Sequence, residues 1–313
     1  MNSVLKPLEL LYRGMNRLRR ALYRRGILRA GRLPRHVISI GNIAMGGSGK
    51  TPLVLTLSRR LQREGFRVAI LTRGYGRNRG AAPGLVEGDA TERFGDEPVL
   101  LARSLPGVDV IVDSDRIRGG LRYLETHDCD LFVLDDGFQH FRLRRDLDIV
   151  IHSADPGWLR EGPSSLRFAD LLVVRGKPSD LPSHGSVHRG ELRPLSFRWR
   201  GDEHALVELH GKRVVAFAGL ADNDQFFRLV EQVGAVIAGR RSFPDHHRYA
   251  TSEIESLRHL LDANRGDLLL TTEKDAVKLR DDEIASLRVD LEVDEQLLER
   301  VLALVAPTLQ ERE

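Results

Sequence analysis

A glycine-rich turn followed by a lysine and a threonine, Lys50 and Thr51, is the stretch of this sequence with the most evident chemistry. It joins an apolar β-branched run, residues 37–40, to an apolar-periodic segment, so the predicted order is strand, loop, helix. In such a loop, backbone N–H groups face phosphate oxygens, the lysine reaches the outer phosphates and the threonine hydroxyl can bind Mg²⁺. Proline is tolerated in the first turn of the helix. The residues predicted to bind the nucleotide are Gly46, Gly47, Ser48, Gly49, Lys50, Thr51 and Pro52.

The loop departs from the usual GxxxxGK[ST] pattern at the first glycine position, which Ala44 occupies. Gly46, Gly47 and Gly49 provide the backbone freedom instead. An ordinary glycine-rich turn is the alternative, but such a turn has no need of the lysine or the threonine. We therefore predict a nucleotide phosphate site.

A second signal is the stretch LFVLDDGFQH, residues 131–140. Four apolar residues that end in aspartate indicate a buried strand that delivers a carboxylate to the phosphate site. Asp135 or Asp136 would bind Mg²⁺, directly or through water, beside the threonine hydroxyl of the loop. The alternative is that one of the two only caps the following turn. Gln139 and His140 follow on the same loop and can contact the acceptor or the nucleotide.

Asp96 belongs to the stretch GDEP, at the predicted start of a helix. This position is typical of an N-cap residue, whose side chain accepts a hydrogen bond from the helix backbone. The functional alternative is a general base that takes a proton from an acceptor hydroxyl. Spacing alone favours the cap.

The stretch FPDHHRY has a carboxylate beside two imidazoles, at Asp245, His246 and His247. A carboxylate next to a histidine can orient and polarise a base. Adjacent histidines can also bind a metal, but no cysteine or further cluster has the spacing to complete a zinc site. Ordinary turn or surface histidines are the alternative.

The stretch TEKDAVKL follows a predicted strand. Its two lysines, Lys274 and Lys278, can face nucleotide phosphates across a cleft. In the alternative, which the spacing favours, Thr272 caps a helix, Asp275 completes the capping box and Lys278 is solvated.

Composition indicates a globular protein with a substantial core: 313 residues, 41% hydrophobic and 30% charged. The single cysteine, Cys129, excludes internal disulfides and fits a reducing compartment. No run of about 18 apolar residues predicts a membrane-spanning helix, and no secretory signal is expected. The net charge of +3 is uneven, because ten basic residues and one acid up to Arg35 give +9 there and leave −6 for the remainder.

Residues 4–25 predict an amphipathic helix whose apolar and arginine-rich faces are opposed. A basic amphipathic helix can lie on an anionic membrane with its arginines on lipid phosphates. Equally, it can pack on the domain with a solvated basic face. A nucleic-acid-binding arm is a third and weaker reading, because stacking aromatics are not interleaved and the body of the chain is acidic.

Strands and helices alternate beyond the phosphate loop, which predicts a parallel sheet covered by helices on both faces, with ligands at the carboxyl ends of the strands. The expected strands in the first half are 67–72, 108–112, 131–134, 147–152 and 171–174. Residues 176–204 are predicted to be a connector of little periodicity. A second α/β series follows, with strands expected at 213–218, 235–238, 267–271 and 289–293. Two domains with a cleft between them are the expected result.

Taken together, these motifs resemble one family, the tetraacyldisaccharide 4′-kinases. The stretches that carry the resemblance occur in the family's order: GNIAMGGSGKTPL, TRGYGR, FGDEP, the DR of VDSDR, VLDDGFQH, the RE of WLRE, FAGLADNDQFF, FPDHH and TEKDAVKL. They cover residues 36 to 280, and the unusual first loop position is also a family trait. The resemblance implies ATP-dependent phosphorylation of the 4′-hydroxyl of a lipid A precursor, an acylated glucosamine disaccharide, to give lipid IVA with ATP and Mg²⁺ as cofactors.

The resemblance also implies a fold and an organisation. The fold would be a P-loop NTPase-like α/β/α sandwich with a second, smaller α/β/α domain and a short β linker. Residues 1–35 would form a basic helix and arm bound to the cytoplasmic face of the bacterial inner membrane, as a peripheral protein. Residues 36–200 would form the kinase domain, and 201–313 the smaller domain that closes the cleft.

Roles for individual residues follow from the same resemblance. It implies Asp96 as the catalytic base, His246 as its partner and Lys50 on the phosphates. The implied metal ligands are Thr51, Asp135 and Asp136. The implied substrate residues are Arg73, Arg116, Gln139, Arg160 and Glu161.

Two stretches depart from the family pattern. HSADPGWLREG is shorter than the usual glycine- and proline-rich loop before Arg160 and Glu161, and FAGLADNDQFF varies from the more usual FAGIGNP. The first departure affects a loop expected to contact the lipid.

The predicted function is therefore a lipid A 4′-kinase without a nucleic-acid or obligate protein partner. The alternative is a P-loop ATPase switch that acts on a protein partner, which would leave the Asp96 and His246 motifs and the basic arm unexplained.

Overall fold

The structure is a computed structural model that describes residues 6–44, 49–78, 80–88, 90–154, 158–177, 181, 183–279 and 281–310. The α-helices are α1 (Lys6–Arg24), α2 (Lys50–Arg63), α3 (Thr91–Phe94), α4 (Asp96–Ser104), α5 (Arg116–Leu124), α6 (Asn223–Gln232), α7 (Thr251–Ala263), α8 (Glu273–Leu279), α9 (Glu295–Val305) and α10 (Pro307–Gln310). Two 3₁₀ helices are η2 (Pro163–Phe168) and η3 (Leu206–Leu209). The strands are β1 (His36–Asn42), β2 (Val68–Thr72), β3 (Gly84–Leu85), β4 (Asp109–Val112), β5 (Leu131–Asp135), β6 (Leu147–Ser153), β7 (Leu171–Arg175), β8 (Val187–Trp199), β9 (Asp202–Ala205), β10 (Arg213–Ala218), β11 (Val236–Ser242), β12 (Leu268–Thr272) and β13 (Ala285–Val293).

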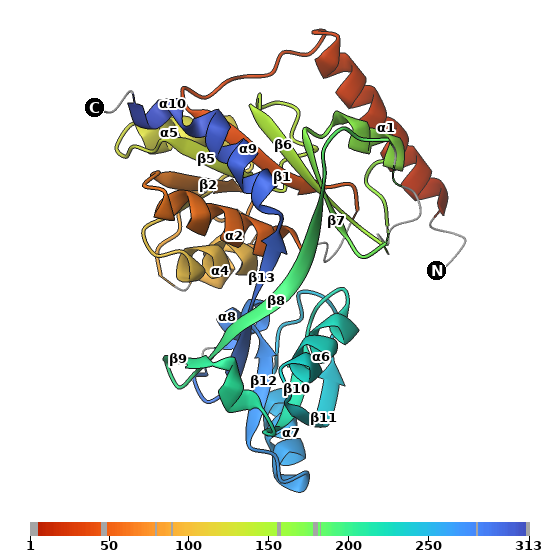
Figure 1. The fold of residues 1–313 in the computed structure, drawn as a ribbon, viewed down its shortest axis with the longest axis vertical. Helices are drawn as coiled ribbons and strands as arrows, with labels where there is room; N and C mark the ends of the chain where they lie inside the picture. Colours follow the sequence, from red (N-terminus) through yellow and green to blue (C-terminus); the bar gives the residue numbers. More distant parts are fainter. Residues whose placement is uncertain are drawn as a thin grey trace.

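The strands pair in the order β11-β10-β12-β13-β8-β7-β6-β1-β5-β2-β4-β3, with β9 paired to β8 (Figure 1). The strands from β7 to β4 run parallel, and β1 lies between β5 and β6. Their carboxyl ends therefore meet at one edge of the sheet, where the sequence predicts the ligand.

Alternate residues of the central strands face two different cores, which explains their nearly continuous apolar runs. One core joins β1, β2 and β5 to α2, α4 and α9, with Ile38 and Val133 among its buried residues. The opposite core joins the same strands to α5, with Val37 and Phe132 buried. Helices on both faces give the predicted three-layer arrangement.

The second α/β series repeats this arrangement on a smaller scale. Val214 and Ala216 of β10 pack with α6 on one face, and Val215 and Phe217 pack with α7 on the other. Strands β11, β10, β12 and β13 are parallel and form the lower part of the molecule in Figure 1.

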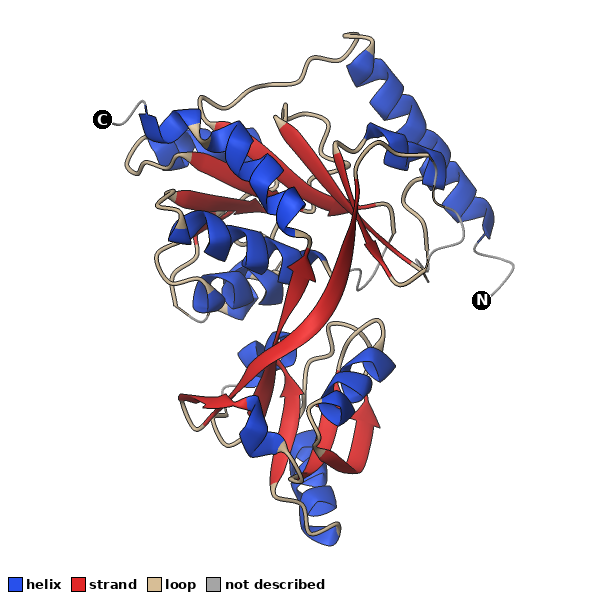
Figure 2. Cartoon of the chain, in the orientation of Figure 1, coloured by secondary structure: helices blue, strands red, loops and turns tan. Residues whose placement is uncertain are grey.

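The segment expected to be a connector contains a long strand. β8 continues from its parallel pairing with β7 at residues 187–189 into antiparallel pairing with β13 at residues 190–198. Figure 2 shows these two strands crossing between the upper and lower parts of the molecule. The sequence does not predict this strand, because β8 is only partly buried and its side chains therefore lack a clear apolar period.

The last helices return to the first core. Leu297, Leu298 and Val301 of α9 are buried with α2 and β1, although their chain segment follows the second α/β series. Helix α9 therefore packs on the first α/β series.

Helix α1 packs on the rest of the molecule through polar side chains. Asn16 and Arg20 are buried, whereas Leu10, Leu11, Met15 and Leu18 are exposed. The packed alternative had expected the apolar face inside, but the fold places it outside. No helix in the described residues is both long and apolar enough to cross a membrane.

Candidate active site

A cleft of about 750 Å³ lies at the carboxyl ends of the central strands and is lined by both α/β series. Lys50, Thr51 and Pro52, in the first turn of α2, line it. Gly49 precedes them with a φ of 91°, a left-handed conformation that glycine adopts readily. The predicted ligands Gly46, Gly47 and Ser48 lie outside the described residues.

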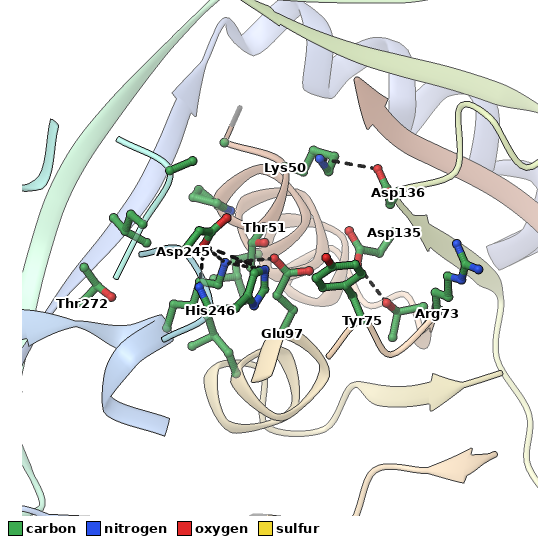
Figure 3. Close-up of a pocket in the computed structure, with 18 of the residues that line it drawn as sticks. Lys50, Thr51, Arg73, Tyr75, Glu97, Asp135, Asp136, Asp245, His246 and Thr272 are labelled. Atoms are coloured by element: carbon green, nitrogen blue, oxygen red, sulfur yellow. Dashed lines mark hydrogen bonds and ion pairs between the residues drawn. The ribbon is translucent and has the colours of Figure 1, made fainter. Parts of the chain in front are cut away.

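The two strand-end carboxylates have different surroundings (Figure 3). Asp135, the last residue of β5, is buried and accepts a hydrogen bond from Thr72 Oγ1 at 3.0 Å. Asp136 follows with a φ of 52°. It lies 3.5 Å from Lys50 Nζ and accepts hydrogen bonds from Arg160 Nη1 at 2.6 and 2.8 Å.

These surroundings move the pKa values of the two groups in opposite directions. Burial raises the pKa of Asp135 to about 7, and the nearby Glu97 and Asp136 carboxylates add to the rise. Burial also opposes ionisation of Asp136, but Lys50 and Arg160 outweigh it and lower the pKa of Asp136 to about 2. Asp136 is therefore the carboxylate that stays charged without further cations.

The donor set at this end of β5 fits Mg²⁺. The described residues contain no group of three or more His, Cys, Asp or Glu side chains able to hold a metal by themselves. Mg²⁺ typically takes only one or two carboxylates and completes its shell with substrate phosphates and water. The Thr51 hydroxyl and the Asp135 and Asp136 carboxylates beside a phosphate loop match that requirement.

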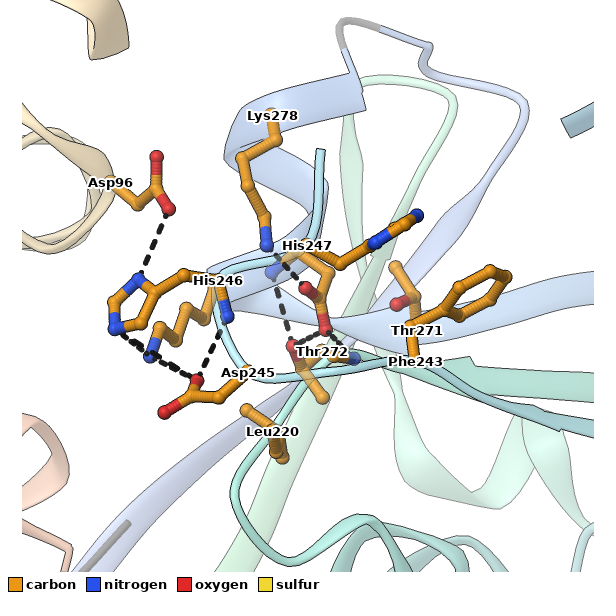
Figure 4. Close-up of polar contacts among 12 residues, drawn as sticks. Asp96, Leu220, Phe243, Asp245, His246, His247, Thr271, Thr272 and Lys278 are labelled. Atoms are coloured by element: carbon orange, nitrogen blue, oxygen red, sulfur yellow. Dashed lines mark hydrogen bonds and ion pairs between the residues drawn. The ribbon is translucent and has the colours of Figure 1, made fainter. Parts of the chain in front are cut away.

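Asp96 contacts His246, which lines the cleft, although the two residues are 150 positions apart in the chain (Figure 4). Asp96 itself is not among the lining residues, whereas its neighbour Glu97 is. His246 Nδ1 lies 3.5 Å from Asp96 Oδ2. Asp96 is the first residue of α4 and makes no cap hydrogen bond, because Gly95 occupies the cap position. The N-cap interpretation of Asp96 is therefore wrong.

Lys274 contacts the second ring nitrogen of His246, Nε2. Its Nζ lies 3.2 Å from His246 Nε2, 3.0 Å from Asp245 Oδ1 and 3.5 Å from Glu97 Oε1. The ring of Tyr75 contacts the imidazole at a centroid distance of 4.9 Å. His247 faces away and pairs with Glu253 at 2.9 Å, so only one of the two histidines serves the cleft.

Lys278 lies neither in solvent nor in the cleft. Its side chain is 7% exposed, and Nζ donates to Asp275 Oδ1 at 2.6 Å. The Asp275 backbone N–H donates to Thr272 Oγ1 at 3.1 Å, which is one of the two bonds of the predicted capping box. The Asp275 carboxylate accepts from the Thr272 hydroxyl at 2.8 Å, whereas the box would have it accept from the Thr272 backbone N–H. Both expectations for Lys278 are therefore wrong.

Four of the five predicted substrate residues, Arg73, Arg116, Gln139 and Arg160, line the cleft. Arg116 is buried, donates to the Ser114 carbonyl at 3.1 Å and has its pKa lowered by burial.

Glu161 is the exception. It is 2% exposed and accepts from Arg20 at 2.7 and 2.9 Å and from Gln139 at 3.0 Å. The structure thus places Glu161 behind the cleft wall, where it fixes α1.

Sequence reasoning missed several cleft residues. These residues lie at the ends of strands, just after a strand or at the start of a helix, all at the ligand edge of the sheet: Thr72, Arg175, Tyr75 and Glu97. Their position at that edge is the sequence signal that could have identified them. Helix α1 also contributes Tyr12, Asn16 and Arg19, which no local pattern could have assigned to the cleft.

Comparison with known proteins bears on this arrangement. The LpxK family model, described as tetraacyldisaccharide-1-P 4′-kinase, matches residues 1–306. A tetraacyldisaccharide 4′-kinase from Pelobacter propionicus is 39% identical over 302 residues, which cover 88% of this chain and 83% of the relative. A tetraacyldisaccharide 4′-kinase from Syntrophus aciditrophicus is 37% identical over 314 residues, which cover 88% of this chain and 84% of the relative.

The solved structures include LpxK from Aquifex aeolicus in complex with ATP. It is 32% identical to this chain, with a TM-score of 0.80 over 97% of this chain and 99% of that one. The predicted P-loop kinase fold and the family resemblance are both confirmed. The chain therefore belongs to the tetraacyldisaccharide 4′-kinase family and is an ATP-dependent kinase.

Proposed function

We propose that this protein transfers the γ-phosphoryl group of ATP to the 4′-hydroxyl of tetraacyldisaccharide 1-phosphate, giving lipid IVA. The observation that carries the proposal is the contact between Asp96 and His246, a residue that lines the same cleft as Lys50 and the strand-end acids. A proton acceptor beside a phosphate site is the combination that a kinase for an alcohol requires.

Lys50 and the start of α2 would hold the nucleotide phosphates, because both present positive charge to the same point. Thr51, Asp135 and Asp136 would hold Mg²⁺, which supplies charge neutralisation to the transferred phosphoryl group. Arg160, already paired with Asp136, would add a second fixed cation beside the transfer site.

Asp96 would remove the proton of the acceptor hydroxyl. With Lys274 donating toward His246 Nε2, the imidazole carries its proton on Nδ1 and donates it to Asp96 Oδ2. His246 thereby orients the carboxylate and leaves its second oxygen free to accept the hydroxyl proton.

The Asp96→Ala variant tests this assignment. We expect kcat to fall by ~10²–10⁴-fold with ATP binding nearly unchanged, because the base acts on the acceptor. Transfer of labelled phosphate from ATP to the lipid in detergent micelles measures it, with Asp224→Ala on α6 as a surface control. An unchanged kcat would refute a base role for Asp96.

Helix α1 is proposed to dock on the cytoplasmic face of the bacterial inner membrane. Leu10, Leu11, Met15 and Leu18 expose apolar surface, while the opposite side of the helix is fixed by Arg20. Exposed apolar side chains next to arginines suit the headgroup region of an anionic bilayer. Because α1 also lines the cleft, a lipid could pass from the membrane to the transfer site without crossing bulk water.

Substituting two of these side chains tests the docking without deleting the helix. Leu11 and Leu18 are 71% and 60% exposed, so Leu11→Glu with Leu18→Glu should preserve the fold and abolish co-sedimentation with anionic vesicles. Val207→Glu, at a site 76% exposed on η3, is the matched control. Undiminished co-sedimentation of the double variant would rule out α1 as the membrane contact.

The division of the chain is likewise proposed: a membrane helix and arm over residues 1–35, a kinase domain over 36–200 and a smaller domain from 201, with α9 and α10 returned to the first core. The rival interpretation, an ATPase switch acting on a protein partner, draws no support from the relatives. Lipid-independent ATP hydrolysis without labelled lipid would revive it.

A further inference from the structure

We propose that Arg175 is an additional ligand of the nucleotide phosphates, which binds the α- or β-phosphate of ATP next to the phosphate loop. The inference rests on the proposed function, in that ATP is the phosphoryl donor. It assigns a role to a residue that none of the motifs contains.

Arg175 is the last residue of β7, so its side chain starts at the ligand edge of the parallel sheet. The side chain lines the cleft together with Gly49 and Lys50. Arg175 Nη1 would be 3.0 Å from a Cβ added at Gly49, so the guanidinium lies against the residue that caps α2. Backbone N–H groups at this end of α2 would point at the same phosphates.

The guanidinium is buried without a partner among the described residues. Arg175 is 8% exposed, yet its side chain makes no hydrogen bond or ion pair there. The neighbouring cleft arginines differ, because Arg160 is tied to Asp136 and Arg116 donates to the Ser114 carbonyl. Burial lowers the pKa of Arg175, and the Asp222 carboxylate only partly offsets this.

Burying a cation is unfavourable unless an anion or acceptor pairs with it, and the described residues offer Arg175 none within hydrogen-bonding distance. Planar guanidinium groups bind phosphates through two parallel hydrogen bonds, so a bound phosphate would satisfy Arg175. The acceptor lipid also carries a phosphate, but the contact with Gly49 places the guanidinium beside the nucleotide loop.

Nucleotide binding by Arg175→Gln is the decisive measurement. By calorimetry, we expect the Kd of ADP to rise about ten- to hundredfold, the effect of losing charge-assisted hydrogen bonds, and the KM for ATP to rise in parallel. The Kd of adenosine should stay the same, since it has no phosphate. kcat at saturating ATP should change by less than about threefold.

Three comparisons make the result specific. Arg175→Lys should recover part of the ADP affinity, because it restores the charge without the planar fork. Arg189→Gln, on the neighbouring strand β8 and exposed, removes the same charge outside the cleft and should leave the Kd of ADP unchanged. The melting temperature of Arg175→Gln should not fall, because the side chain has no hydrogen bond or ion pair to lose among the described residues.

Other outcomes would overturn the proposal. An unchanged Kd of ADP would show that Arg175 does not bind phosphate. An equal loss for adenosine would move the contact to the base or ribose. A raised KM for the lipid with normal ADP binding would place the guanidinium at the acceptor, and this last result would leave the kinase function itself intact.

Discussion

Asp135 and Asp136 are adjacent in the chain, but their surroundings shift their pKa values in opposite directions. Asp136 faces Lys50 and Arg160, whereas Asp135 accepts a hydrogen bond from the Thr72 hydroxyl, and burial raises the pKa of Asp135 despite the nearby Lys50. A cation bound beside both would favour the ionised form of Asp135. The pair can therefore share the metal unequally, with Asp136 also fixing the position of Lys50.

Glu273, the first residue of α8, is a half-buried carboxyl on the cleft wall that destabilises the protein at neutral pH. Burial raises the pKa of Glu273 from 4.5 to about 7, against the opposite effects of Arg288 and Arg59. Between these pH values the unfolded chain releases its proton while the folded chain retains it. The unfolding free energy therefore falls as pH rises through this window, by at most roughly 3 kcal/mol, and stays lower above it.

The Glu273→Gln variant should remove this slope. We expect it to be more stable than the parent at pH 8, by up to roughly 3 kcal/mol, and close to the parent at pH 4.5. Urea unfolding at the two pH values measures the difference. Glu283→Gln, at a side chain that is largely exposed, should show no such dependence, and equal effects of Glu273→Gln at both pH values would contradict the prediction.

At the scale of elements, the loop after β2 and the start of α4 fit together through glycine. Gly95 has a φ of 97° and a ψ of 162°, a combination essentially restricted to glycine. A Cβ on Gly95 would come within 2.3 Å of the Tyr75 carbonyl oxygen. This close packing sets Asp96 and Tyr75 on the two sides of His246.

Replacing Gly95 by alanine should therefore disturb stability and activity together. We expect Gly95→Ala to lower the unfolding free energy by at least about 3 kcal/mol, from backbone strain plus the clash, and to reduce kcat. Gly65→Ala is the matched control: its φ is 89° but nothing lies within 4 Å, so about 1 kcal/mol is expected. Equal losses in the two variants would show that the contact with Tyr75 is unimportant. Thermal melts and lipid phosphorylation measure both effects.

At the scale of the whole molecule, the two α/β series are joined by two strands, by apolar packing of Val277 against α4 and by an ion-paired lysine. β8 and β13 connect the two α/β series, and Lys274 bridges Asp245 to Glu97 of α4. Although burial opposes its charge, Glu97 and Asp245 raise the pKa of Lys274, so the lysine stays charged. The position of His246 relative to Asp96 depends on this bridge.

The Lys274→Met variant should weaken the contact between the two α/β series. The carboxylates of Glu97 and Asp245 would then lie near each other without the cation that pairs with both. We expect kcat to fall roughly 10- to 100-fold because His246 is misplaced. Small-angle scattering should show a larger radius of gyration. Lys212→Met, an exposed lysine before β10, should change neither quantity. A normal kcat with unchanged scattering would refute the bridging role.

The sequence alone predicts most of the elements and contains a motif typical of phosphate binding. Runs such as residues 131–135 predict buried parallel strands because apolar period and chain direction are local properties. The carboxyl-edge rule then places Lys50, Asp135 and Asp136 together without further information. The sequence does not predict β8, because its side chains are only partly buried and its pairing partner β13 is distant in the chain.

Which polar groups are available for chemistry depends on long-range packing. Glu161 pairs with Arg20, Lys278 with Asp275 and His247 with Glu253, so none of these three is free in the cleft. His246 instead reaches Asp96 across 150 residues, and α1 turns its apolar side outward. Such choices depend on which distant side chain arrives within hydrogen-bonding distance, and this is set by packing of whole elements rather than by any local spacing.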